Sequence, residues 1–298
     1  MVPRAGFEPA TLGLEVLCSI QLSYRGPHFS VYYSRTLKNK NPQMLLFALL
    51  LVFIGIAAGL AWFLIAHDHG EKEPIAALWM AAGFGLAGAA LAGFLEGWFI
   101  PAGNLLPGTP HGTLLVTTLA VGVIEEACKF VPLALVIYKR HYFNEHTDGV
   151  IYFALAGLGF GLPENILYAL QFGTRTAMAR VLLTPFFHAT TTGLVGYFLV
   201  KRKLAKRSPF VVLLPLASVM VLHGLYDFGL TSGSALYAAG SLLITLGAGI
   251  GLFVAFLRAN EHDQDMGLSV VGHNAFCRSC GFANPRHHLY CVHCGKNA

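Results

Sequence analysis

The chain has 298 residues, of which 55% are hydrophobic and only 12% are charged. Soluble domains usually carry about 25% charged residues, so this composition excludes an ordinary soluble protein. The formal net charge is +5, but the basic residues lie in short segments between apolar runs, where Lys and Arg mainly set membrane orientation. We therefore expect no nucleic-acid partner, and the lipid bilayer as the natural environment.

The segment from residue 1 to residue 43 is expected to lie outside the fold. Residues 2–26 read VPRAGFEPATLGLEVLCSIQLSYRG, without apolar periodicity or helix signals. This stretch resembles the translation of a transfer-RNA gene read on its opposite strand, with GFEP matching the T-arm and CSIQLSYRG the D-arm. A disordered tail is the alternative. Such segments are set aside before the fold is considered, and the native protein is expected to begin near Met44.

Seven apolar runs predict seven transmembrane helices, because a hydrocarbon core of about 30 Å takes roughly 20 helical residues. The runs fall at residues 44–66, 75–100, 113–138, 149–172, 179–200, 209–230 and 234–257. Small residues in the second run (AAGFGLAGAALAG) and the seventh (GAGIG) favour close helix packing in a membrane. The sequence thus predicts an all-α polytopic membrane core over residues 44–258.

The basic residues between the runs predict the orientation. The fifth connection, KRKLAKR, has five of them, and the third has Lys139 and Arg140. The second and sixth connections have none, while the fourth carries Arg175 and Arg180. The positive-inside bias places the odd connections and the C-terminus in the cytosol and the N-terminus outside. We expect the membrane to be a bacterial cytoplasmic membrane.

Ionisable and polar residues gather at one depth within the apolar runs. A charge at the bilayer centre costs at least ~2.5–3.5 kcal/mol, so each is a candidate for function. Each also has a structural reading, such as an internal ion pair on one helix face or a helix–helix hydrogen bond. Their common depth near the midplane favours a functional site, whereas Glu96 and Trp98 are interpreted as interfacial. The candidates are Glu125, Glu126, Lys129, Glu164, Asn165, His188, His223 and Asp227.

Four motifs in order carry a family resemblance. They are EExxK from Glu125, FxxxEN from Phe160, His188 within FFHATTTG, and HxxxD from His223. Across roughly residues 44–257 the chain resembles the PrsW family of intramembrane proteases, distant relatives of the CAAX-type prenyl-protein endopeptidases. The second CAAX motif ends in His, where this chain has Glu164. The resemblance implies hydrolysis of a peptide bond in or near a membrane-spanning substrate, such as an anti-sigma-factor-like regulator.

The resemblance also implies roles for the candidate residues. A buried carboxylate can act as general base and then acid, and Glu125 or Glu126 is expected in that role, with Glu125 favoured. Lys129 would hold one carboxylate, and Asp227 or Asn165 would support the site. A catalytic divalent metal, expected to be zinc, would be bound by His188, His223 and Glu164. The same residues also allow a metal-free mechanism.

Two other classes of protein would use the same residues differently. A transporter or channel would use the buried charges as a pathway, although no internal repeat of the kind many transporters show is visible. A non-catalytic membrane scaffold or sensor would keep a protease-like core without chemistry. Cleavage of a reconstituted membrane substrate separates these classes from a protease.

The C-terminal residues predict a separate zinc ribbon over residues 275–298. Two CxxC pairs ten residues apart are typical of a structural zinc site with four thiolates. A pair of disulfides is disfavoured if the tail is cytosolic, since thiols stay reduced there. Residues 259–274 are expected to form a polar linker, and the ribbon to dock a partner or substrate. The four ligands would be Cys277, Cys280, Cys291 and Cys294.

Overall fold

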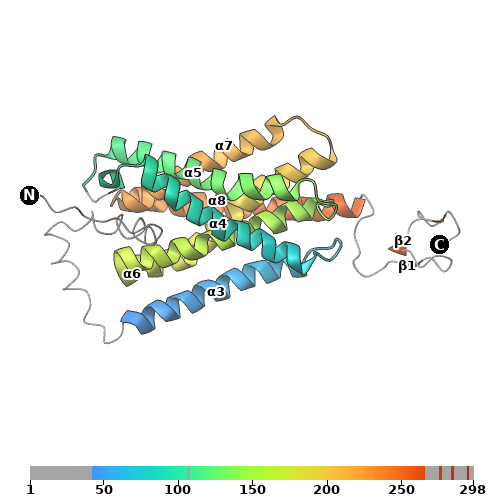
Figure 1. Cartoon of the computed structure of the whole chain (residues 1–298), viewed down its shortest axis with the longest axis horizontal. Coiled ribbons are helices and arrows are strands. Elements are labelled where there is room, and N and C mark those ends of the chain that lie inside the picture. Colours follow the sequence, from blue (N-terminus) through green and yellow to red (C-terminus); the bar gives the residue numbers. More distant parts are fainter. Residues whose placement is uncertain (1–41, 106–107, 266–274, 277–282, 285–293, 295–298) are drawn as a thin grey trace, which may run out of the picture.

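The computed structural model describes residues 42–105, 108–265, 275–276, 283–284 and 294. These residues confirm the predicted all-α core (Figure 1). The elements are α3 (Pro42–Ala66), α4 (Ile75–Phe99), η1 (Ala102–Leu105), α5 (His111–Ile137), α6 (His146–Leu204), α7 (Phe210–Thr231), α8 (Ala235–Asp265), β1 (Ala275–Phe276) and β2 (Ala283–Asn284). The first helix begins two residues before Met44, and the rest of the expected N-terminal extension lies outside the described residues.

Five segments of these helices are long and apolar enough to cross a membrane. The polar residues of α5, led by Glu125, Glu126 and Lys129, keep that helix out of this set although it has 27 residues. Bulky apolar side chains, such as Trp62 and Trp79, are exposed on the outside of the bundle, where lipid would cover them. The five segments are Phe47–Ala66, Ile75–Phe99, His146–Tyr168, Phe210–Thr231 and Ala235–Gln264.

The fourth and fifth apolar runs both lie in α6, which is helical over 59 residues. A straight helix of that length would measure about 88 Å, roughly twice the thickness of a bilayer. Two close approaches show instead that the helix folds back into antiparallel arms, because Gly149 lies against Gly196 and Gly157 against the carbonyl of His188. We expected a connection between two separate helices at residues 173–178. That expectation is wrong, because these residues are helical and belong to α6.

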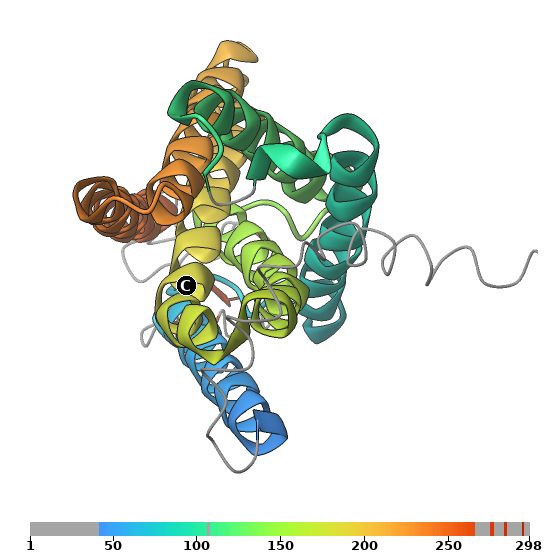
Figure 2. The same ribbon diagram turned by 90° about the vertical axis from the view of Figure 1, so that its left-hand side faces the viewer.

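The arms of α6 lie in the middle of the bundle, with the other five helices around them (Figure 2). The small residues of α4 allow this packing, as predicted for the second apolar run. A Cβ at Gly85 would overlap the carbonyl oxygen of Ala156 on α6, and one at Gly88 would lie 2.8 Å from the carbonyl oxygen of Cys128 on α5. These close contacts hold both α5 and α6 against α4. The two helices α5 and α6 carry most of the candidate residues.

Helix α8 continues to Asp265, so the expectation of a polar linker from residue 259 is wrong for its first seven residues. Asp263 is completely buried and accepts hydrogen bonds from the backbone N–H groups of His146 (2.7 Å) and Thr147 (3.0 Å). A carboxylate bonded to free N–H groups stabilises a helix N-terminus. The end of α8 is thus part of the core because it caps α6.

The C-terminal region contains a short antiparallel pairing. Ala275 pairs with Asn284 and Phe276 with Ala283, on either side of the first CxxC pair. Cys277, Cys280 and Cys291 lie outside the described residues, so the zinc ribbon stays a prediction.

Candidate active site

Helix α5 brings two glutamates and a lysine into the centre of the bundle. Glu125, Glu126 and Lys129 are 6%, 1% and 0% exposed, although each would be charged in water. Positions three and four apart share a helix face, and Lys129 Nζ lies 3.2 Å from Glu125 Oε2 and 2.8 Å from Glu126 Oε1. Burying these groups is tolerable only because they are paired.

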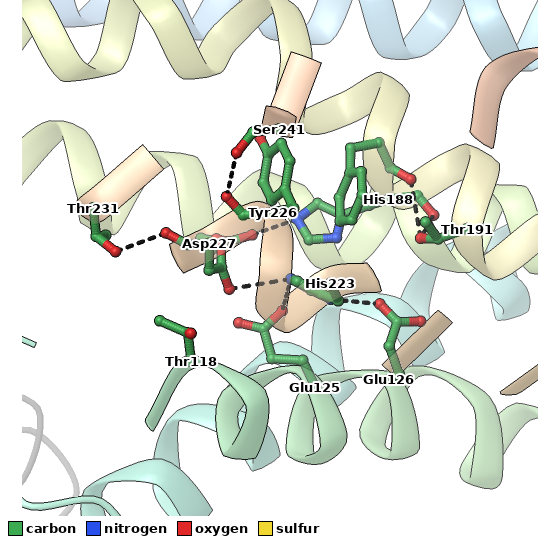
Figure 3. A network of polar contacts seen from close by, with 12 residues as sticks. Thr118, Glu125, Glu126, His188, Thr191, His223, Tyr226, Asp227, Thr231 and Ser241 are labelled. Atoms are coloured by element: carbon green, nitrogen blue, oxygen red, sulfur yellow. Dashed lines mark hydrogen bonds and ion pairs between the residues drawn. The ribbon is translucent and has the colours of Figure 1, made fainter. Parts of the chain in front are cut away.

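His223 of α7 lies against both glutamates (Figure 3). Its Nδ1 is 2.7 Å from Glu126 Oε1, and its Nε2 is 3.4 Å from Glu125 Oε2 and 3.5 Å from Asp227 Oδ2. Because a carboxylate only accepts hydrogen bonds, Nδ1 carries the proton, and in the neutral ring the lone pair is then on Nε2. In the described part of the chain Nε2 has no hydrogen-bond partner. This nitrogen is therefore free for a metal or a water proton.

His188 reaches the same centre from the second arm of α6. Its Nε2 lies 2.5 Å from Glu164 Oε2, and its Nδ1 lies 2.9 Å from Lys129 Nζ. The carboxylate again takes the N–H, so Nδ1 is the nitrogen with the lone pair and accepts from the lysine. The rings of His188 and His223 are 5.4 Å apart between centroids. The structure thus brings residues from three helices to one point.

Glu164 is held by a residue that sequence reasoning placed elsewhere. Arg180, assigned above to an external connection, is 5% exposed, and its Nη2 donates to Glu164 Oε1. Its guanidinium lies 3.6 Å from the centroid of the Tyr168 ring. The sequence did hold one signal, since Arg180 precedes His188 by two helical turns and shares its face. The partner Glu164 could not be found that way, because the pairing depends on how α6 folds back.

Aromatic rings and an amide surround the charged centre. Phe187 and Tyr226 stack with centroids 4.0 Å apart, and the Phe160 ring lies 4.1 Å from Lys129 Nζ. Asn165 donates from Nδ2 to the carbonyl of Gly161 at 2.9 Å. This apolar shell lowers the local dielectric, so the interactions among the enclosed charges are stronger than in water.

Three side chains of the centre fit a divalent metal. Glu125, His188 and His223 each offer one ligand atom, and these atoms lie within 4.8 Å of one another. Two histidines and a carboxylate are a common catalytic zinc set. Metal-bound histidines usually donate their second N–H to a carboxylate, as His223 does to Glu126 and His188 to Glu164. Glu164, expected above as a ligand, thus lies behind His188, and Glu125 faces the ligand position.

Comparison with known proteins gives a family match. The family described as PrsW family intramembrane metalloprotease matches residues 73–258, more than half of the chain. The chain is similar to proteins named Protease PrsW from three organisms. From Bacillus subtilis the identity is 37% over 123 residues, 41% of this chain and 56% of that protein.

From Geobacillus kaustophilus the identity is 29% over 181 residues, 60% of this chain and 78% of that protein. From Clostridioides difficile the identity is 30% over 196 residues, 60% of this chain and 77% of that protein. The chain therefore spans little more than half of the Bacillus subtilis relative, and no solved structure matches it. The matched residues contain the three helices that carry the paired glutamates and the two histidines, and the chain belongs to the PrsW family of intramembrane metalloproteases.

Proposed function

We propose that the protein is an intramembrane protease in which Glu125 activates the attacking water. The observation that carries this proposal is the unequal use of the two glutamates. Glu126 bonds to Lys129 and His223 at 2.8 and 2.7 Å, whereas the contacts of Glu125 are 3.2 and 3.4 Å. Glu126 therefore holds Lys129 and His223 in place. Glu125 can exchange a proton beside Nε2 of His223, which has no hydrogen-bond partner among the described residues.

The reaction follows from these positions. Glu125 takes a proton from water while the water oxygen adds to the carbonyl carbon of the substrate. The carbonyl π pair moves to oxygen and forms a tetrahedral oxyanion. When the carbonyl re-forms, the C–N bond breaks, and the proton on Glu125 passes to the leaving nitrogen. A single carboxyl can thus serve as base and then as acid, and the products are a carboxylic acid and an amine.

A divalent metal, for which zinc is the expected ion, would be held by Nδ1 of His188 and Nε2 of His223. Glu125 faces the same point, either as a third ligand or as the base beside it. When bound, such an ion lowers the pKa of water and polarises a carbonyl. Lys129 Nζ lies 2.9 Å from the same nitrogen of His188, so metal binding requires the lysine to release it.

The substrate is proposed to be a membrane-spanning protein, with an anti-sigma-factor-like regulator as the expected kind. Its scissile bond has to leave the helical conformation, because helical carbonyls are already hydrogen-bonded within the helix. The C-terminal CxxC pairs are proposed to form a cytosolic zinc ribbon that docks the substrate or a partner. The pairing of β1 with β2 on either side of the first pair supports a compact knuckle there.

The test uses the purified protein in lipid vesicles with a panel of single-span reporters. Each reporter carries a helix-breaking Gly-Pro pair at a different depth, with a fluorophore and a quencher on either side of it. We expect the wild-type protein to cleave at least one reporter and Glu125→Gln to cleave none measurably. Glu261→Gln, an exposed carboxyl at the end of α8, is the matched control. Intact reporters with the wild-type protein would favour a transporter or a scaffold.

Metal analysis gives a second readout that does not depend on turnover. A chain truncated after Asp265 lacks the ribbon but keeps the cap on α6. We expect this chain to retain one divalent ion, and its His223→Ala variant to lose it. Retention of the ion by the variant would place the metal elsewhere. Absence of an ion from the truncated parent would favour the metal-free use of the same residues.

A further inference from the structure

Arg180 is a buried cation with a hydrogen-bond donor to spare. It is 5% exposed, its Nη2 binds Glu164, and its Nε has no partner among the residues the structure describes. A charged side chain inside a membrane protein is costly, and an unsatisfied donor there adds to that cost. A free N–H at this depth therefore points to a ligand that supplies an acceptor.

Without a metal, Lys129, the other buried cation of the centre, has no donor left. The ammonium of Lys129 has three N–H groups, and three acceptors, on Glu125, Glu126 and His188, lie 2.8–3.2 Å from it. Lys129 therefore serves the protein's own carboxylates and rings. Without a metal, Arg180 is therefore the cation beside this centre that has a donor left, among the residues the structure describes, for a negative charge formed during the reaction.

An unused acceptor lies next to the same glutamate. Asn165 follows Glu164 in the first arm of α6 and is 9% exposed. Its Nδ2 binds the carbonyl of Gly161, and its Oδ1 has no partner in the described part of the chain. A peptide backbone outside a helix offers both an acceptor and a donor, its C=O and its N–H. The free Nε–H of Arg180 can bind such a C=O group, and the free Oδ1 of Asn165 can bind such an N–H group.

We propose that Arg180 is a catalytic residue whose Nε–H binds the carbonyl oxygen of the scissile peptide bond, while Asn165 accepts a hydrogen bond from a neighbouring backbone N–H. The ion pair with Glu164 fixes the guanidinium for this task and, through Glu164, aligns His188. As the carbonyl oxygen becomes an oxyanion, the bond from Arg180 strengthens. This inference rests on the proposed protease function.

The experiment compares two substitutions of Arg180 with a matched arginine of the same helix. Arg180→Lys keeps the positive charge beside Glu164 but removes the planar fork and its Nε–H. Arg202, at the other end of the second arm, donates to the Tyr138 hydroxyl about 33 Å along the helix from Arg180. Cleavage of the single-span reporters in vesicles is measured as kcat and KM, together with melting temperature in detergent.

Loss of an oxyanion-binding donor typically lowers kcat by 10²–10³-fold. We expect Arg180→Lys to show a loss of about 10²-fold in kcat with a near-normal melting temperature and a KM within about threefold. In Arg180→Ala, added guanidinium should restore part of kcat, and added ammonium should not. Arg202→Lys should cleave like the wild-type protein.

Three results separate the possibilities. If Arg180→Lys has the kcat and the melting temperature of the wild-type protein, Arg180 only holds α6 together, and the proposal is wrong. If guanidinium and ammonium rescue Arg180→Ala equally, charge alone suffices, and the Nε–H is not used. If the wild-type protein cleaves no reporter, the protease function fails first, and this inference fails with it.

Discussion

The two adjacent glutamates should separate into a chemical and a structural role when each is replaced by glutamine. Glu125→Gln removes the proposed base, and losing a general base commonly costs about 10²–10⁴ in rate. That range corresponds to about 3–5 kcal/mol in the activation barrier. Because the contacts of Glu125 are 3.2 and 3.4 Å, we expect a loss in folding stability of only about 1 kcal/mol.

Glu126→Gln should behave in the opposite way. This residue accepts from Lys129 at 2.8 Å and from His223 at 2.7 Å, and it is 1% exposed. Breaking a buried ion pair leaves an uncompensated charge and costs about 3–5 kcal/mol. For a chain of this size that loss lowers the melting temperature by roughly 10 °C. Activity should fall about 10–100-fold, as is common when the carboxylate that orients a ligating histidine is lost.

The assay pairs thermal melts in detergent, followed by circular dichroism, with reporter cleavage in vesicles. Glu261→Gln controls for the loss of a surface carboxyl. If Glu125→Gln melts well below Glu126→Gln, Glu125 is the structural partner of Lys129 and the proposed division of roles is wrong. A fully active Glu125→Gln protein would also refute it.

Three further outcomes follow from the packing. Burial and the nearby Asp148 carboxylate raise the pKa of Glu145 from 4.5 to about 8. The folded protein therefore holds a proton that the unfolded chain releases, and stability should fall as pH rises from about 4.5 to about 8. Melts at about pH 5 and about pH 9 check this, and Glu145→Gln should reduce the difference. Truncation after Asp265 should leave the melting temperature unchanged, whereas truncation after Leu257 removes the carboxylate cap of α6 and should cost about 1–2 kcal/mol. An equal melting temperature for both truncations would contradict the capping role. Gly157→Ala places a methyl group against the His188 carbonyl, so we expect a loss of about 1–3 kcal/mol and of cleavage. Gly93→Ala, which meets nothing within 4 Å, should change neither.

The sequence by itself determined the class of protein, the limits of three helices and the identity of most polar residues at the centre. Those features depend on local properties, since apolar runs of about 20 residues have to become helices in a bilayer. The predicted limits of α4, α5 and α7 lie within two residues of the observed ones. Motif order identified Glu125, His188 and His223, which the structure brings to one point.

Only the tertiary structure decided how those residues are paired. Arg180 meets Glu164 because α6 folds back on itself, and Asp263 caps α6 from a helix 117 residues further along the chain. The two glutamates are next to each other in sequence, and their different distances to Lys129 and to His223 of α7 arise only in the folded bundle. Contacts of this kind depend on the crossing of packed helices, which no local pattern of residues encodes.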